Sequence, residues 1–390
     1  MTQVQARTIA SKCKKCNGVG RVAKLKKDNT FSKVRYRCHK CNAVGIIYKP
    51  TSEVAGLKLT PRGIFDISVN GFKTDSITLQ ELLTVATGVA RMFIEKYIRY
   101  SSLRTYLTTF VEGIEKAVNE QNFIHPQFMQ CVTSTGRLSS RSPNFQNMPR
   151  GVTFPVRKAI VSRFENGLIL EGDYSQLEFR VAGFLSKDKQ VYKDVKNNVD
   201  VHDYTAKVMG VTRQQAKAHT FKPLYGGVLG TPKQKEYYLK FKLKYEGIAN
   251  WHKELQEEAI IYKRLQLPSG RVYKFPYVER TRYGTATHST SIKNYPVQGF
   301  ATADLLPIAL VKTHKAMKTS GLKSLIINTV HDSIIIDVHP DEKTACITVL
   351  QQGMYSLVSE CKKRYNIDYD MPIGTEFKIG EDWLNLKEIV

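Results

Sequence analysis

The stretch that decides the fold is Leu168-Ile169-Leu170-Glu171-Gly172-Asp173-Tyr174-Ser175-Gln176-Leu177-Glu178-Phe179-Arg180. Its first residues are apolar with strand character, and they place Asp173 at the end of a predicted strand. The polar residues that follow change to a helical spacing, in which Gln176, Arg180 and Gly183 recur on one side. A carboxylate at a strand end is a suitable metal ligand, but an aspartate at such a junction more often caps the helix. The stretch alone leaves both interpretations open.

Composition and charge narrow the class of protein. The 390 residues are 42% hydrophobic, which is enough for a large core divided into two or three subdomains. Lys and Arg total 59 against 35 acidic residues, a formal net charge of +24 that favours nucleic acid as partner. No apolar run is long enough to cross a bilayer, and the N-terminus lacks the apolar core of a signal peptide. We therefore expect a cytoplasmic protein.

Two cysteine pairs predict a zinc-binding module in residues 1–49. Cys13-x-x-Cys16 and Cys38-x-x-Cys41 are separated by 21 residues. The two pairs together can hold a single tetrahedral Zn²⁺, each pair binding it from one side. Residues 1–50 also carry thirteen Lys and Arg but a single Asp, half of the net charge of the whole chain. A zinc ribbon or knuckle that touches phosphate is therefore favoured, with docking to another protein as the alternative.

The next segments are predicted as helices and then as a polar loop. After a linker that begins at Pro50, apolar residues at helical spacing between Ile77 and Val118 predict two or three helices. Residues 131–150 are rich in Thr, Ser, Asn, Gln and Arg, and their prolines and glycine exclude a long helix. Such side chains form ordinary surface loops, but they also bind sugar-phosphate and minor-groove edges.

Five motifs follow one another in a fixed order. They are Thr135-Gly136-Arg137-Leu138-Ser139-Ser140 with Pro143-Asn144-Phe145-Gln146-Asn147-Met148-Pro149; the stretch around Asp173; Asp200-Val201-His202 before Arg213-x-x-x-Lys217-x-x-x-Phe221-x-x-x-Tyr225-Gly226; Pro296-Val297-Gln298-Gly299; and Val330-His331-Asp332. Together with the ending Gly380-Glu381-Asp382-Trp383, they resemble the motifs of family A DNA polymerases, the polymerase I-like enzymes. The similarity extends from about Lys58 to the C-terminus.

The resemblance implies an α+β fold, namely a right-hand polymerase palm with an antiparallel sheet, helical fingers and a partial helical thumb behind the zinc module. The implied division of the chain is 1–49, zinc-binding module; 50–130, linker and partial thumb helices; 131–185, palm entry and first catalytic motif; 186–290, fingers; and 291–390, palm with the second catalytic carboxylate.

Asp173 and Asp332 are the predicted metal ligands. The β-rich runs on both sides of Asp332 predict a hairpin, which would bring the two carboxylates together if it lay beside the strand of Asp173. Two such carboxylates repel each other and need a cation, for which Mg²⁺ is suitable. Two Mg²⁺ (or Mn²⁺) ions can activate a primer 3′-hydroxyl and stabilise the leaving pyrophosphate. The resemblance implies this reaction and adds the carbonyl of Tyr174 as a ligand.

A step of four residues places Arg213, Lys217 and Phe221 on one face of a predicted helix at 213–222. Such a helix could also be an ordinary basic surface helix. By resemblance, Lys217 protonates the leaving pyrophosphate and is catalytic together with the two aspartates. Glu178 excludes a 2′-hydroxyl, and the implied dNTP-binding residues are Arg213, His202, Phe221, Glu178, Tyr225 and Gln176.

The resemblance also implies contacts with primer-template DNA. Arg137 and Gln298 would read minor-groove acceptors, which all correct base pairs share. The implied DNA-binding residues are Arg137, Asn144, Gln146, Asn294, Gln298 and His331.

Three departures from the family pattern stand out. Ser333 replaces a second acidic residue, and Pro223 is expected to bend or end the helix that carries Lys217. Only about 80 residues separate the zinc segment from Thr135, too few for the usual exonuclease domain and full thumb. We expect a DNA polymerase subunit of a split replicative enzyme, of viral or phage type, with a separate chain as possible partner. The alternatives are a non-catalytic DNA-binding accessory protein and a single-chain RNA polymerase.

Overall fold

The structure is a computed structural model, and it describes residues 8–25, 30–41, 44–50, 67–68, 71–72, 74–151, 153–227 and 232–389. The chain divides into two compact units, Met1–Thr109 and Phe110–Val390. Residues 51–66, which contain the linker predicted after Pro50, lie outside the described residues. Among the residues described, no helix is both long and apolar enough to cross a membrane.

Among its described residues, the first unit begins with three antiparallel strand pairs and continues into helices. Its strands are β1 (Thr8–Lys12) paired with β4 (Ile46–Pro50), β2 (Arg21–Leu25) paired with β3 (Phe31–Arg37), and β5 (Ile67–Ser68) paired with β6 (Gly71–Phe72). Asp75 caps α1 by accepting a hydrogen bond from the Thr78 N–H at 2.9 Å. The helices predicted between Ile77 and Val118 are present as α1 (Ser76–Leu83), α2 (Gly88–Thr105), the π-helical turn η2 (Tyr106–Val111) and α3 (Glu112–Glu115). The boundary between the units falls within η2, so α3 belongs to the second unit.

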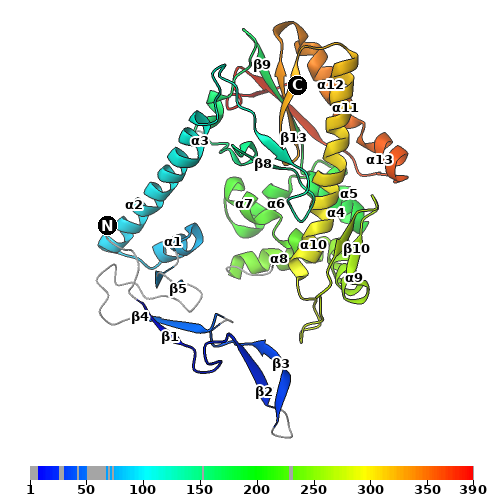
Figure 1. Ribbon diagram of the computed structural model, residues 1–390. Coiled ribbons are helices and arrows are strands. Elements are labelled where there is room, and N and C mark those ends of the chain that lie inside the picture. Colours follow the sequence, from blue (N-terminus) through cyan, green and yellow to red (C-terminus); the bar gives the residue numbers. More distant parts are fainter. Residues whose placement is uncertain are drawn as a thin grey trace. The chain divides into compact units, whose positions relative to one another are not determined.

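The second unit contains a five-stranded antiparallel sheet, of which β9 and β13 are labelled in Figure 1. Its strand order is β12-β13-β9-β14-β15, so the strand of the opening motif lies in the middle. The strands are β9 (Leu168–Tyr174), β12 (Leu325–Val330), β13 (Ser333–Val338), β14 (Thr375–Gly380) and β15 (Lys387–Glu388). The predicted hairpin around Asp332 is confirmed as β12 and β13, and β13 pairs directly with β9.

Helix α12 (Lys343–Tyr355) packs on one face of this sheet. Helices α11 (Leu306–Thr319) and α13 (Leu357–Tyr365) pack against α12 (Figure 1). A Cβ on Gly172 would lie 2.7 Å from the sulfur of Met354, so the glycine allows α12 to pack directly on β9. Because side chains alternate along a strand, Glu171 and Asp173 point away from α12.

The segment between β9 and β12 is mainly helical, with Tyr237, Phe241 and Tyr245 in its core. Its elements are α4 (Leu177–Ser186), α5 (Lys189–Lys196), α6 (Val201–Met209), α7 (Arg213–Thr220), η5 (Pro223–Tyr225), α8 (Pro232–Lys244), α9 (Glu246–Tyr262), β10 (Arg264–Gln266), β11 (Val272–Lys274), α10 (Ser289–Gln298) and η6 (Gly299–Leu305). Shorter elements elsewhere in the unit are β7 (Gln127–Met129), β8 (Ser139–Arg141), η3 (Phe145–Asn147), η4 (Val156–Ala159) and η7 (Pro340–Glu342).

Residues 131–150 contain no long helix, as predicted, but they are not simply a surface loop. Ser140, Phe145 and Met148 are buried. The hydroxyl of Ser140 accepts a hydrogen bond from the Phe145 N–H at 3.3 Å and donates one to the Pro143 carbonyl at 3.2 Å. This closed turn satisfies polar groups locally, which allows the apolar side chains to enter the core.

Candidate active site

Asp173 and Asp332 lie side by side at one end of the sheet. Asp173 is near the end of β9, and Asp332 lies in the turn between β12 and β13. The Tyr174 N–H donates to the Asp332 carbonyl at 3.2 Å, which ties the turn to β9. The Tyr174 side chain is buried and donates to the Met354 carbonyl at 2.7 Å, so only its backbone is available to this site. Gln176, not Asp173, is the residue before α4, so the capping interpretation of Asp173 is wrong.

The environment of the two carboxyl groups favours their neutral forms in the absence of a cation. Burial raises the pKa of Asp173, and the neighbouring Asp332 raises it further. Burial likewise raises the pKa of Asp332, with the charge of Glu178 adding to the effect. Asp173 Oδ1 is buried and has no hydrogen-bond partner among the protein atoms described. A divalent cation bound to oxygen ligands would neutralise this repulsion, so the two groups fit a metal such as Mg²⁺.

Two charged residues beside Asp173 were missed at the level of sequence. Arg150 Nη1 lies 4.0 Å from Asp173 Oδ2. Glu171 is buried and accepts a hydrogen bond from the Trp383 indole N–H at 2.9 Å. The period of two in a strand could have identified Glu171, because it places residues 171 and 173 on one face. Nothing local to Arg150 indicates its contact, which depends on the path of the preceding loop.

A row of three side chains crosses the sheet at Asp173. Ser333 on β13 and Glu376 on β14 are its direct partners in register, and directly opposed residues share one face. Ser333 is fully buried and donates to the Val330 carbonyl at 3.1 Å. Glu376 accepts from Ser175 Oγ at 3.2 Å, and its side chain is 51% exposed. The sheet therefore places a carboxylate opposite Asp173 on the side away from Ser333, which the sequence motifs did not indicate.

Arg137 and Glu178 form an ion pair although 41 residues separate them. Arg137 Nε also donates to Thr302 Oγ1 at 2.9 Å, and Thr302 donates to the Gln298 carbonyl at 2.7 Å. Burial raises the pKa of Glu178 to about 7 and lowers that of Arg137. Burying either charge alone would cost desolvation free energy, and the contact between the two charges offsets part of that cost. The pair joins the loop 131–150, α4 and η6.

The other predicted DNA-binding residues are only partly brought together. Gln146 and His331 line one small pocket with Arg137, and Gln146 Nε2 donates to the Thr329 carbonyl at 3.1 Å. Asn144 caps the turn η3 by accepting from the Gln146 N–H at 3.0 Å. Asn294 lies on α10 and carries a buried Oδ1 with no hydrogen-bond partner among the described residues.

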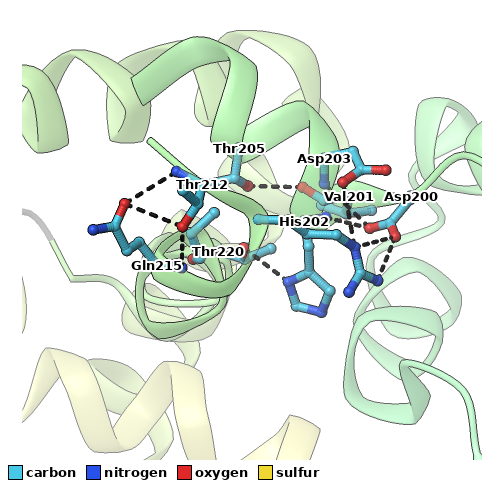
Figure 2. A network of polar contacts seen from close by, with 10 residues as sticks. Asp200, Val201, His202, Asp203, Thr205, Thr212, Gln215 and Thr220 are labelled. Atoms are coloured by element: carbon cyan, nitrogen blue, oxygen red, sulfur yellow. Dashed lines mark hydrogen bonds and ion pairs between the residues drawn. The ribbon is translucent and has the colours of Figure 1, made fainter. Parts of the chain in front are cut away.

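The network between α6 and α7 is shown in Figure 2. Asp200 caps α6 with one carboxylate oxygen, accepting from the His202 N–H at 2.7 Å. Its second oxygen accepts two hydrogen bonds from Arg213, at 2.9 and 2.5 Å. Asp203 lies 3.2 Å from Arg213 Nε. Arg213 is therefore not a free cation, which the motif alone does not reveal.

His202 and Lys217 belong to the same region. His202 Nδ1 lies 3.0 Å from Thr220 Oγ1, which links α6 to the end of α7 (Figure 2). Burial lowers the pKa of His202, Asp200 opposes this, and Arg213 and Lys217 lower it further. The imidazole is consequently neutral at pH 7. Lys217 is exposed on α7.

The helix predicted at 213–222 ends earlier than expected. The structure ends α7 at Thr220, so Phe221 follows the helix and does not complete a face with Arg213 and Lys217. The reason is Pro223, which has no N–H to donate and whose ring would clash with a continuing helix. The ring of Phe221 packs 6.1 Å from that of Phe179, in the hydrophobic core to which Tyr225 also contributes.

The four cysteines of the first unit form a separate candidate metal centre. All four Sγ atoms lie within 4.8 Å of one another, and the cysteines are buried. The Sγ atoms of Cys13 and Cys38 are 3.9 Å apart, and those of Cys16 and Cys41 are 3.5 Å apart. A tetrahedral zinc with Zn–S bonds of about 2.3 Å requires S–S separations of about 3.8 Å, so the cluster could bind one Zn²⁺.

Backbone groups support this cysteine cluster. The Gly20 N–H donates to Cys16 Sγ at 3.3 Å, and the Gly45 N–H donates to Cys41 Sγ at 3.2 Å. Gly45 has φ of 83°, and a Cβ there would lie 2.0 Å from the Gly18 carbonyl oxygen. The two turns thus pack against each other because both carry glycine where they meet.

Comparisons with known proteins decide the family. The profile described as DNA polymerase family A matches residues 57–385, most of the chain. The chain belongs to DNA polymerase family A. It is 29% identical over 340 residues to DNA polymerase I of Lactococcus lactis and 30% identical over 349 residues to that of Caldicellulosiruptor bescii. These matches cover 81% of this chain but 37% and 38% of the relatives, so the chain spans under two fifths of their length.

A solved structure supports the same fold for this family A chain. It is the polymerase domain of Pol1 from M. smegmatis in complex with DNA primer-template and dNTP. The TM-score is 0.70 at 23% identity, and the match covers 85% of this chain and 59% of that one. The predicted α+β fold and the family resemblance are therefore confirmed. The cysteines at 13–41 lie ahead of the family A match, which begins at residue 57.

Proposed function

We propose that this chain catalyses template-directed DNA synthesis, in which deoxynucleotides from dNTPs are added to a primer 3′-hydroxyl. The observation that carries the proposal is the pair Asp173 and Asp332, held together on adjacent parts of one sheet with their pKa values raised. Cationic side chains of α7 lie near the same end of the sheet, because Arg213 and Lys217 both interact electrostatically with Glu376. Carboxylates beside cations suit phosphoryl transfer.

The shared sheet supports the proposed division of the chain. Residues 131–185 and 291–390 both contribute strands to it and would form the palm, while the helical segment 186–290 would form the fingers. Residues 50–130 would supply a linker and partial thumb, and residues 1–49 the zinc module.

Asp173, Asp332 and the carbonyl of Tyr174 would hold two Mg²⁺ (or Mn²⁺) ions. When bound, these ions would activate the primer hydroxyl and stabilise the charge on the leaving pyrophosphate. The unpartnered Asp173 Oδ1 supports this assignment, since a buried carboxylate oxygen needs a partner. The four cysteines would hold one structural Zn²⁺, which would stabilise the first strand pairs.

The nucleotide would lie between α7 and the sheet. Arg213 and neutral His202 would bind the triphosphate, and Lys217 would give a proton to the pyrophosphate as it leaves. Glu178, held by Arg137, would occupy the space of a 2′-hydroxyl and so select dNTPs. Gln176, Phe221 and Tyr225 complete the proposed nucleotide contacts.

The DNA would be bound by the pocket of Arg137, Gln146 and His331, together with Asn144, Asn294 and Gln298. Thr302 accepts a hydrogen bond from Arg137 Nε and donates one to the backbone carbonyl of Gln298, so these two proposed DNA-binding residues lie close together. The acceptors they would read are common to all correct base pairs.

Primer extension by the purified full chain tests the proposal. We expect incorporation of dNTPs in preference to rNTPs in the presence of Mg²⁺. Preference for rNTPs would favour the RNA polymerase alternative. DNA binding without extension, with and without a co-purified chain, would favour the accessory-protein alternative. The same assay tests the proposed split enzyme: a partner that supplies thumb functions should lengthen the products made per binding event, and one that supplies an exonuclease should remove mismatched 3′ ends.

The Mg²⁺ requirement is expected to increase as the pH falls. The raised pKa values of Asp173 and Asp332 bring protonation of the pair towards neutral pH, so protons compete with the cation. Between pH 8.5 and 6.5, the Mg²⁺ concentration for half-maximal extension should rise about tenfold, since each proton displaced makes binding up to about tenfold weaker per pH unit. Magnesium titrations at each pH and saturating dNTP measure this. A constant half-saturation point would contradict it.

Replacing Asp203 by asparagine is expected to improve dNTP binding. The Asp203 carboxylate lies 3.2 Å from Arg213 Nε and would compete with the triphosphate for this cation. The side chain is 63% exposed, so the gain is limited to about 1 kcal/mol, or a KM for dNTP up to about fivefold lower. Single-nucleotide kinetics at low ionic strength measure it, with Asp203→Glu as the charge-conserving control. A KM that rises in Asp203→Asn would show that Asp203 positions Arg213.

A further inference from the structure

The hairpin of β2 and β3 extends from the four-cysteine cluster and has two different faces. Its register pairs Arg21 with Arg37, Val22 with Tyr36, and Ala23 with Arg35. Val22 packs against the cysteines, so the face that carries Val22 points inwards at the base of the hairpin. The alternate residues of both strands therefore lie on the opposite, outer face.

Three arginines occupy this outer face. Arg21, Arg35 and Arg37 are all exposed, and Arg21 stands directly across the ladder from Arg37. Like charges directly opposed on a strand pair destabilise it. Acidic side chains are scarce in this part of the sequence, since Asp28 is the single carboxylate in residues 1–50. A surface of this kind becomes favourable when a polyanion covers it.

Nucleic acid fits this face better than an acidic protein does. Guanidinium groups bind phosphate through two parallel hydrogen bonds, and three of them on one face of a strand pair suit a repeating phosphate backbone. Phe31 on the same strand is 69% exposed, so its ring adds an aromatic surface on which a base could stack. The net charge of +24 on the whole chain favours the same class of partner.

We propose that Arg21, Arg35 and Arg37 form a binding face for the DNA phosphate backbone, separate from the polymerase site. The face would hold the same DNA on which the second unit acts and so slow its release. The inference rests on the proposed function for the identity of the nucleic acid. The zinc site would serve it indirectly, since the cysteine turns fix the base of the hairpin.

The test measures DNA binding by the full-length, zinc-loaded chain. The variant Arg21→Gln/Arg35→Gln/Arg37→Gln keeps polar side chains with most of the aliphatic stem and removes three charges. Its matched control is Lys14→Gln/Lys15→Gln/Lys40→Gln, three exposed lysines in the cysteine turns. Fluorescence anisotropy with a labelled primer-template between 50 and 300 mM salt gives the slope of log K against log salt. One zinc per chain, measured by a chromogenic chelator, verifies that each variant is folded.

We expect the arginine variant to lower the magnitude of this slope by about 3, because each phosphate contact contributes about 0.9 for duplex DNA. The lysine control should change it by less than 1. An unchanged slope in the arginine variant, or an equal change in both variants, would overturn the proposal. Failure of the proposed function is a distinct result, in which the wild-type chain does not extend primers whatever its slope.

Discussion

Asp173→Asn is expected to abolish primer extension, with a loss of at least about 10³-fold, while primer-template binding persists. A metal ligand lost from the reacting centre removes several kcal/mol of transition-state stabilisation, and each 1.4 kcal/mol is about tenfold in rate. Asp332→Asn should also abolish extension and leave DNA binding intact, since both carboxyl groups lie in one site. Single-turnover extension and anisotropy on the same preparations measure the two properties.

The melting temperature of the metal-free protein shows whether Asp173 is a metal ligand or a residue that stabilises the fold. The pKa of Asp173 is raised in the folded state, so ionising it above its unfolded-state pKa costs folding free energy. Asparagine removes this cost, and the melting temperature of the metal-free variant should therefore rise by about 2 °C or more at pH 8. A lowered melting temperature with equal losses of extension and DNA binding would indicate a structural role.

Glu376→Gln is the matched control for the aspartates. Glu376 lies directly opposite Asp173 in the sheet but is half exposed and already accepts hydrogen bonds from Ser175 and Lys378. Its loss should slow extension by less than about tenfold, because an exposed carboxylate contributes little electrostatic energy. If it abolished extension, the catalytic pair would have to be extended to a third carboxylate.

Lys217→Ala is expected to reduce the rate of nucleotide addition by about 10²-fold to 10³-fold, with little change in the KM for dNTP. A positioned general acid contributes about 10²-fold to 10⁴-fold. Lys217 lies on α7, one turn after Arg213, in the region whose charges act on His202 and Glu376. Rapid-quench kinetics over a range of dNTP concentrations separate the two constants.

Two further variants assign the role of Lys217. Lys217→Arg keeps the charge but holds its proton too tightly to act as an acid, so it should remain as slow as the alanine variant. Lys222→Ala removes an exposed lysine just beyond the same helix and should stay within about twofold of wild type. A raised KM with an unchanged rate in Lys217→Ala, or full rescue by arginine, would show that only the charge matters.

Several features of the site could be read from local patterns. The apolar run before Asp173 and the two runs around Asp332 contain enough strand-forming residues to specify β9, β12 and β13. Pro223 lacks the N–H that a helix needs, so the sequence predicts a break near this residue, and the helix ends at Thr220, two residues before the predicted end. The cysteine spacing likewise encodes its own turns through nearby glycines.

Other features depend on residues that are distant along the chain. The pairing of Arg137 with Glu178, the capture of Arg213 by Asp200, and the position of Arg150 have no signature in any short window. Each contact arises because packing brings two segments together and burial then requires each charge to find a partner. The partner of each buried charge is therefore set by which side chains the fold brings next to it.

By itself, the sequence determined the strands that carry Asp173 and Asp332, the cysteine turns and the family, because these follow from the periodicity and chemistry of neighbouring residues. Only the tertiary structure decided the register that aligns Ser333, Asp173 and Glu376, since register depends on how β13 and β14 pack against β9. It also raised the pKa values of the two aspartates, because burial and mutual repulsion exist only once the chain has folded.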